Sequence, residues 1–210
     1  MLKELDEKLS ARGFCVRGAF SDNGRTLVLI GNVGSDMWDH FGEKPNDWVE
    51  PDPLDQWCKE FIDEIAKGYE ASAIYPFEGP KFPPFQQWAL RAEDVHKSPL
   101  GMLIHPEYGL WHAYRAAFLF KEEIPGIEEV EKQKSPCEKC FSKPCLMGCP
   151  VDAYTGKSFK ASRCLDYLNK NLEGACMHKG CLARMACPVG SDYAYKVEHR
   201  RFHQERFLDT

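Results

Sequence analysis

The feature that most constrains this chain is the position of its cysteines. Of the 10 cysteines, eight fall between residues 137 and 187, and four of these lie in the stretch SPCEKCFSKPCLMGCPVDA at 135–153. Before residue 130 the chain carries only Cys15 and Cys58. Such a gathering of thiols is typical of metal or cluster ligands in a reducing compartment and of disulfide frameworks in a secreted protein.

The start of the chain favours the reducing compartment. MLKELDEKLS predicts a charged amphipathic helix and lacks the basic-then-apolar order of a signal peptide. Apolar runs such as LVLIGNV are far shorter than the roughly 20 residues that span a bilayer. The net charge of -5 argues against a general nucleic-acid or anionic-membrane binder. We therefore expect a cytoplasmic protein with no membrane partner, whose thiols are ligands.

Eight thiolates are the number that two 4Fe–4S clusters require. Cys149 and Cys187 are each followed by proline. In bacterial two-cluster ferredoxins, three close cysteines bind one cluster, while a fourth, placed before proline, binds the other. By this analogy we predict two crossed ligand sets. The first set is Cys137, Cys140, Cys145 and Cys187, and the second set is Cys149, Cys164, Cys176 and Cys181.

Three other interpretations of the thiols stay open at this point. Zinc accepts four cysteines, although its modules usually pair two short spacings, which the later cysteines lack. A disulfide scaffold would require a secretory signal. A single cluster would leave some cysteines unused, and Cys176 or Cys181 would be the first of these. Cys15 and Cys58 fit small buried hydrophobes in a strand and on a helix.

The first half of the chain has the patterns of a layered domain. GFCVRGAF and RTLVLIGNV flank SDNG and predict a hairpin, because Asn-Gly supplies the positive φ angles of a tight turn. DPLDQWCKEFIDEIAKG has apolar residues at helical spacing, with Asp52 as N-cap, Pro53 at the first position and Gly68 as the stop. ASAIYPF predicts a further strand, and two apolar runs flank a polar bend at 105–109.

These patterns predict an α+β protein of two domains. Residues 1–125 would form a small α/β-layered N-terminal domain, and residues 126–210 a ferredoxin-like two-cluster iron-sulfur domain with a C-terminal helix. The charged segment KEEIPGIEEVEKQKS at 121–135 would connect them.

The order of these cysteine motifs, including CLDYL around Cys164, resembles the two-cluster module of epoxyqueuosine reductases and corrinoid-dependent reductive dehalogenases. In epoxyqueuosine reductases two residues separate the second and third cysteines, whereas here FSKP at 141–144 puts four in this gap. The last three cysteines are also more widely spaced here. The resemblance implies two 4Fe–4S clusters and an oxidoreductase of this kind.

A second match lies upstream, where MLIHPEYG at 102–109 resembles a segment that lies against cobalamin in epoxyqueuosine reductases. The resemblance implies corrin-side contacts from His105, Glu107, Tyr108 and His112. The two matches together cover about residues 88–190. The chain has no counterpart of that family's Asp-Tyr-His stretch, and its N-terminal half is short for a full corrinoid-binding domain.

Three functions follow as hypotheses. The first is a redox protein that relays single electrons between a donor or acceptor protein and a cofactor or substrate at the N-terminal domain. The second is a cobalamin-dependent reductase or cobalamin-processing protein, with a corrinoid or another small molecule as ligand. The third is a non-enzymatic sensor or structural partner protein that uses its clusters without catalysis. No catalytic residue can be named from the sequence.

Overall fold

The structure, a computed structural model, describes residues 1–42 and 52–209. Contacts divide the chain into two compact units. Unit 1 contains residues 1–94 and 112–132, and unit 2 contains residues 95–111 and 133–210. The segment 95–111, which includes the HPEYG turn, therefore groups with the cysteine-rich part of the chain.

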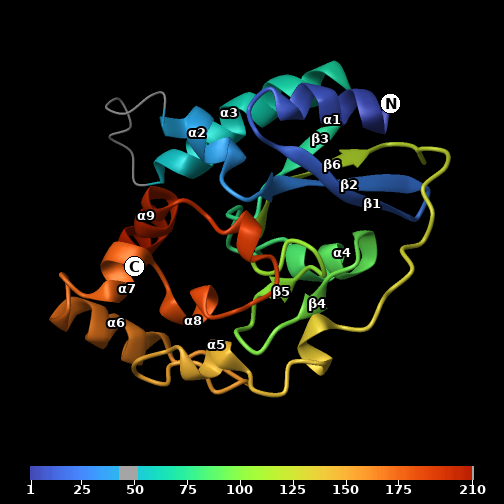
Figure 1. Cartoon of the computed structure of the whole chain (residues 1–210). Helices are drawn as coiled ribbons and strands as arrows, with labels where there is room; N and C mark the ends of the chain where they lie inside the picture. The colour runs from blue at the N-terminus through green and yellow to red at the C-terminus, as the bar shows by residue number, and fades with distance from the viewer. Residues whose placement is uncertain (43–51, 210) are drawn as a thin grey trace. The chain divides into compact units, whose positions relative to one another are not determined.

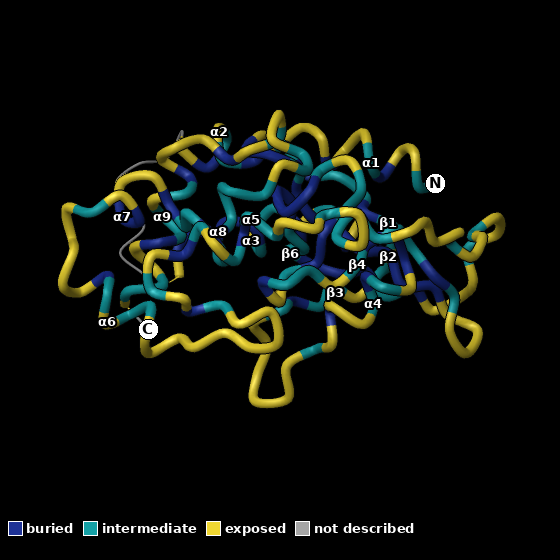
Figure 2. Tube along the Cα trace, turned by 60° about the horizontal axis from the view of Figure 1, so that its bottom comes forward, coloured by how far each residue is buried: buried dark blue, intermediate teal, exposed yellow. Residues whose placement is uncertain are grey.

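Unit 1 is built on a four-stranded antiparallel sheet with the strand order β1-β2-β6-β3. Its strands are β1 (Cys15–Asp22), β2 (Arg25–Val33), β3 (Ser72–Ile74) and β6 (His112–Phe120). Its helices are α1 (Leu2–Ser10), α2 (Asp36–Gly42), α3 (Pro53–Gly68) and α4 (Phe85–Ala92). α1 and α3 cover one face of the sheet, and α4 lies on the other (Figure 1). The central strand β2 is buried along most of its length (Figure 2).

The predicted hairpin is confirmed. β1 pairs with β2 up to Asp22 and Arg25, and the two residues between them have the required positive φ, 52° at Asn23 and 74° at Gly24. Each strand then places apolar side chains toward the helices. The turn residues therefore set the register that the buried faces of the sheet need.

The predicted amphipathic helix is confirmed as α3, with Trp57, Cys58 and Ile62 on its buried side. Its ends differ from the prediction. Asp52 is at the N-cap position but makes no side-chain capping hydrogen bond, and Gly68 is the last helical residue and not the stop. The chain leaves the helix through Tyr69 and then Glu70, which has a φ of 52°.

Unit 2 is made of short elements held together by an apolar core that includes thiols. A two-stranded sheet pairs β4 (His96–Lys97) with β5 (Leu103–Ile104). The helices are α5 (Pro144–Met147), α6 (Ala161–Lys170), α7 (Ala175–Lys179), α8 (Leu182–Met185) and α9 (Val197–Leu208), with 3₁₀ turns at Pro136–Glu138 and Ser191–Tyr193. Cys145 and Cys149 pack in one core with Leu100, Ile104 and Leu110.

The predicted α+β class is confirmed, with a sheet that is antiparallel throughout. The domain ranges 1–125 and 126–210 stay a prediction, as does the ferredoxin-like character of the second domain. Among the helices of the described residues, none is long and apolar enough to cross a membrane.

Candidate functional site

The thiols of the first predicted ligand set are neighbours in unit 2. Burial raises the pKa of the Cys145 thiol, and Cys187, Cys137 and Cys140 raise it further. Burial likewise raises the pKa of Cys187, with an added contribution from Cys140. One thiol affects the pKa of another only at short range. These four side chains, which come from segments more than forty residues apart, therefore face one small volume.

The thiols of the second predicted set are neighbours in the same way. Burial raises the pKa of Cys164 to about 11, with contributions from Cys181, Cys149 and Cys176. Burial also raises the pKa of Cys176, which feels Cys181 and Cys149. The mutual pKa effects thus follow the two predicted sets, while one apolar core contains thiols of both sets. That they hold clusters stays a prediction.

Two short helices explain how the sets cross. α5 follows Lys143 and connects Cys145 of the first set to Cys149 of the second, and α8 connects Cys181 of the second set to Cys187 of the first. One helical turn advances about 5.4 Å, which is enough to send thiols at its two ends to different sites. The helices pack closely, because a Cβ added to Gly148 would lie 2.9 Å from Cβ of Ala186.

Hydrogen-bond donors point at the sulfur atoms of both sets. The Ala153 N–H donates to Cys149 Sγ at 3.3 Å. Backbone hydrogen bonds at Leu146, Leu182 and Val189 lower the pKa values of Cys145, Cys176 and Cys187 against the dominant effect of burial. These donors favour thiolate over thiol, and thiolate is the form that binds metal.

Two side chains distinguish the surroundings of the two sets. Lys143, within the FSKP gap, donates from Nζ to the carbonyl oxygen of Cys137. Partial burial raises the pKa of the Cys137 thiol, and the charge of Lys143 acts against this rise. The Tyr154 hydroxyl lies 4.0 Å from Cys181 Sγ, and its ring stacks on Phe159 at 4.6 Å. The first set therefore has a cation beside it, and the second has a phenol.

Thiolates are soft ligands that suit both a zinc ion and an iron-sulfur cluster. Among the residues that the structure describes, no group of three or more His, Cys, Asp or Glu side chains is arranged around one metal ion. A zinc ion needs its ligands about 2.3 Å from a single point. In a 4Fe–4S cluster each thiolate binds a different iron, so the sulfur atoms stand farther apart. Four soft thiols in each partly buried neighbourhood match this requirement.

The predicted corrin-side residues fall in both units. In unit 2, the His105 ring stacks on Tyr108 at 4.2 Å, and its Nδ1 accepts the N–H groups of Glu107 and Tyr108 at 3.1 and 3.2 Å. Glu107 accepts a hydrogen bond from the Tyr193 hydroxyl. His112 instead belongs to β6 of unit 1, where its buried ring meets Tyr114 edge-on at 5.7 Å.

Three cavities of unit 1, of about 290 to 460 Å³, are lined by residues other than His112. The four candidates have structural contacts of their own, and their contact with a corrin stays a prediction.

The HPEYG turn packs directly on the loop that carries Cys187. Gly109 has a φ of 58°, and a Cβ there would lie 1.8 Å from the carbonyl oxygen of Val189. Gly190 has a φ of 68°, and a Cβ there would lie 2.3 Å from the carbonyl carbon of Tyr108. Only glycine permits backbones to approach so closely. The turn therefore helps to position the fourth thiol of the first set.

Arg184 joins the same segment to the C-terminal part of unit 2. Its guanidinium lies 4.5 Å from the ring centres of both Trp111 and Tyr195, and its Nε donates to the Leu110 carbonyl at 3.2 Å. Tyr195 stacks in turn on His199 of α9 at 4.1 Å. The sequence analysis did not single out Arg184. Its place in CLARMAC, between two predicted ligand cysteines, could have indicated a structural role near the thiols.

Comparison with known proteins gives a shared fold. No protein-family model and no curated protein sequence matches the chain. The structure is similar to the C. elegans B12-trafficking protein CblC, a homologue of human MMACHC, with a TM-score of 0.56 and 15% identity over 99% of this chain and 94% of that one.

Two epoxyqueuosine reductase structures are similar as well. A selenomethionine-labelled one has a TM-score of 0.52 and 14% identity over 95% of this chain and 68% of that one. The Bacillus subtilis enzyme has a TM-score of 0.52 and 15% identity over 93% of this chain and 66% of that one. Identities this low establish the fold alone. The chain thus shares its fold with epoxyqueuosine reductases and with a B12-trafficking protein.

Replacing Gly109 by alanine should destabilise unit 2, because the new Cβ meets a backbone oxygen that cannot move alone. We expect the midpoint of thermal unfolding to fall by about 5–10 °C, which corresponds to roughly 2–3 kcal/mol for a chain of this size. Gly101→Ala is the matched control, since Gly101 also has a positive φ, 78°, but no atom within 4 Å of an added Cβ. Equal shifts in the two variants would show that the close packing at Gly109 does not contribute to the free energy of unfolding.

Replacing Arg184 by lysine should lower stability although the charge is retained. The lysine loses the planar group between Trp111 and Tyr195 and the Nε hydrogen bond, which together contribute about 2–3 kcal/mol. Arg201→Lys on the exposed side of α9 is the control. Thermal unfolding followed by circular dichroism should separate the two variants by at least about 4 °C, and no separation would contradict this role of Arg184.

Proposed function

We propose that this chain is an iron-sulfur redox protein that holds two 4Fe–4S clusters and relays single electrons to a cofactor, a substrate or a partner protein. One observation supports the proposal: eight thiols of unit 2 affect one another's pKa values in two groups of four, and hydrogen bonds are directed at several of the sulfur atoms. When bound, such clusters supply one-electron carriers whose potentials depend on hydrogen bonds, burial and nearby charge.

The residues around each set have separate tasks in this proposal. The cysteines bind as thiolates, and the backbone N–H groups at Leu146, Ala153, Leu182 and Val189 stabilise the negative charge on sulfur. The apolar core around Cys145 and Cys149 limits the access of water. Lys143 lies beside the first set and Tyr154 beside the second, so the two clusters would differ in reduction potential.

Anaerobic purification tests the proposal directly. We expect about eight iron atoms and eight acid-labile sulfides per chain, four of each for each cluster. Cys187→Ser should reduce both to about four, because it removes one ligand of the first set only. Cys15→Ala is the control and should keep the full content, since Cys15 lies in β1 of unit 1. Stoichiometric zinc without iron would refute the proposal.

The two unequal surroundings predict separate effects on reduction potential. Lys143→Met removes the cation beside Cys137 at similar volume, and it should make reduction of the cluster at the first set harder by about tenfold in equilibrium constant, or ~59 mV. Tyr154→Phe keeps the stack on Phe159 and should affect only the second set. Spectroscopic redox titration measures both, with Lys139→Met as an exposed-lysine control. Identical potentials in all variants would contradict these roles.

Cobalamin binding is a second candidate function, and the fold favours it. The fold matches that of a B12-trafficking protein over 99% of this chain and 94% of that one. Titration of the purified protein with hydroxocobalamin tests this candidate. A saturable change in the corrin absorption bands would support it, and unchanged bands would exclude it.

A further inference from the structure

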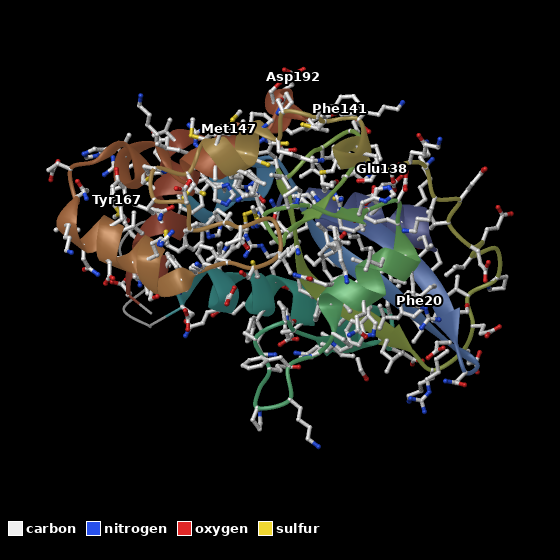
Figure 3. The ribbon with its side chains drawn as sticks, turned by 90° about the horizontal axis from the view of Figure 1, so that it is seen from below. Phe20, Glu138, Phe141, Met147, Tyr167 and Asp192 are labelled. Atoms are coloured by element: carbon white, nitrogen blue, oxygen red, sulfur yellow. The ribbon has the colours of Figure 1, made fainter. Side chains whose placement is uncertain are left out.

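The two most exposed large apolar side chains of the described residues both border the first thiol set. Phe141 is 94% exposed and directly follows Cys140, and Met147 is 71% exposed and lies between Cys145 and Cys149. Both are labelled in Figure 3, at the upper edge of the view. Large apolar side chains this exposed are common at sites that bind other proteins.

The loop that carries Phe141 is anchored on its inner side. Lys143 has a φ of 43°, which is uncommon for a residue other than glycine, and its ammonium group bonds to the carbonyl of Cys137. The Lys143 carbonyl accepts the N–H of Leu146 at 2.9 Å at the start of α5. A lysine held in this strained conformation fixes the path of the FSKP loop. Phe141 is therefore held outward by its own loop.

The charge of unit 2 indicates what kind of partner fits this surface. Unit 2 carries 14 Lys and Arg residues against nine Asp and Glu residues, a net charge of +5, whereas unit 1 carries 13 against 23, a net charge of -10. Lys134 and Lys139, which are exposed, lie in the segment that contains the first ligands. Exposed Glu138 lies beside Lys139, so the positive charge is a property of unit 2 as a whole. A unit with a net positive charge attracts acidic partners and speeds their association.

We propose that Phe141 and Met147, on the basic unit 2, form the docking surface for an acidic electron-carrier protein that reduces the cluster held by the first thiol set. This inference rests on the proposed function and names the partner of the same site. In the transfer, the carrier is oxidised by one electron and the cluster is reduced by one electron, and no bond is made or broken. Docking at Cys140 gives the electron a short path to a ligand sulfur.

Stopped-flow reduction of the cluster-loaded protein tests this docking surface. The probes are a reduced acidic flavodoxin and, separately, dithionite, which needs no docking surface. We expect Phe141→Ala to lower the second-order rate constant with flavodoxin by about tenfold, as is typical of a central apolar contact. The rate with dithionite should not change. Leu172→Ala is the matched control, because Leu172 is also exposed (54%) and lies in the same unit. Higher ionic strength should slow the flavodoxin reaction more than the dithionite reaction, because flavodoxin presents many negative charges at once and dithionite is a small anion.

The outcomes separate this inference from the proposed function. If dithionite reduces no cluster in the wild-type protein, the proposed function fails and the docking surface fails with it. Two outcomes overturn only the docking surface, and in both dithionite reduces the clusters. In the first, flavodoxin does not reduce the wild-type protein. In the second, flavodoxin reduces Phe141→Ala as fast as it reduces the wild type. A single-stranded RNA that binds the wild type and not Phe141→Ala, with flavodoxin rates unchanged, would assign the surface to nucleic acid and also overturn it.

Discussion

The convergence of Cys187 on Cys137, Cys140 and Cys145 is the constraint on which unit 2 depends. Cys149 is nearer in sequence to these three thiols than Cys187 is, but its effect on pKa falls on Cys164 and Cys176. The one-turn helices α5 and α8 each connect a thiol of one predicted set to a thiol of the other, and Gly148 lets the two helices pack closely. Because the thiols repel one another as thiolates, the arrangement requires a compensating charge, which a metal cluster and the directed N–H groups would provide.

The same constraint explains why the segment 95–111 belongs with the cysteine-rich unit. Cys187 sits on a loop, and a loop needs support to hold a ligand in place. The HPEYG turn gives this support through the backbone contacts of Gly109 and Gly190. Arg184 holds the residues after the turn through the Leu110 carbonyl oxygen and the Trp111 ring. The motif that resembles a corrin-side segment therefore has a structural task in this protein, whatever else it binds.

The hairpin, α3 and the α+β class could be predicted from the sequence, because each depends on local rules: Asn23-Gly24 for a tight turn and helical spacing of Trp57, Cys58 and Ile62 for a buried face. The grouping of the thiols into two neighbourhoods could be anticipated from the two Cys-Pro pairs. The contacts of His112, Arg184 and Gly109 could not, because they depend on which distant segments meet. His112 lies three residues after the HPEYG turn, so the sequence groups it with the turn. In the structure the chain enters unit 1 at this residue.

The crossed thiol sets are tested most directly by diffraction at the iron absorption edge from anaerobically grown crystals. The account predicts two separate four-iron peaks, one bonded to Cys137, Cys140, Cys145 and Cys187 and the other to Cys149, Cys164, Cys176 and Cys181. A single peak, a peak at the zinc edge instead, or density that joins Cys149 to the same cluster as Cys145 would contradict it.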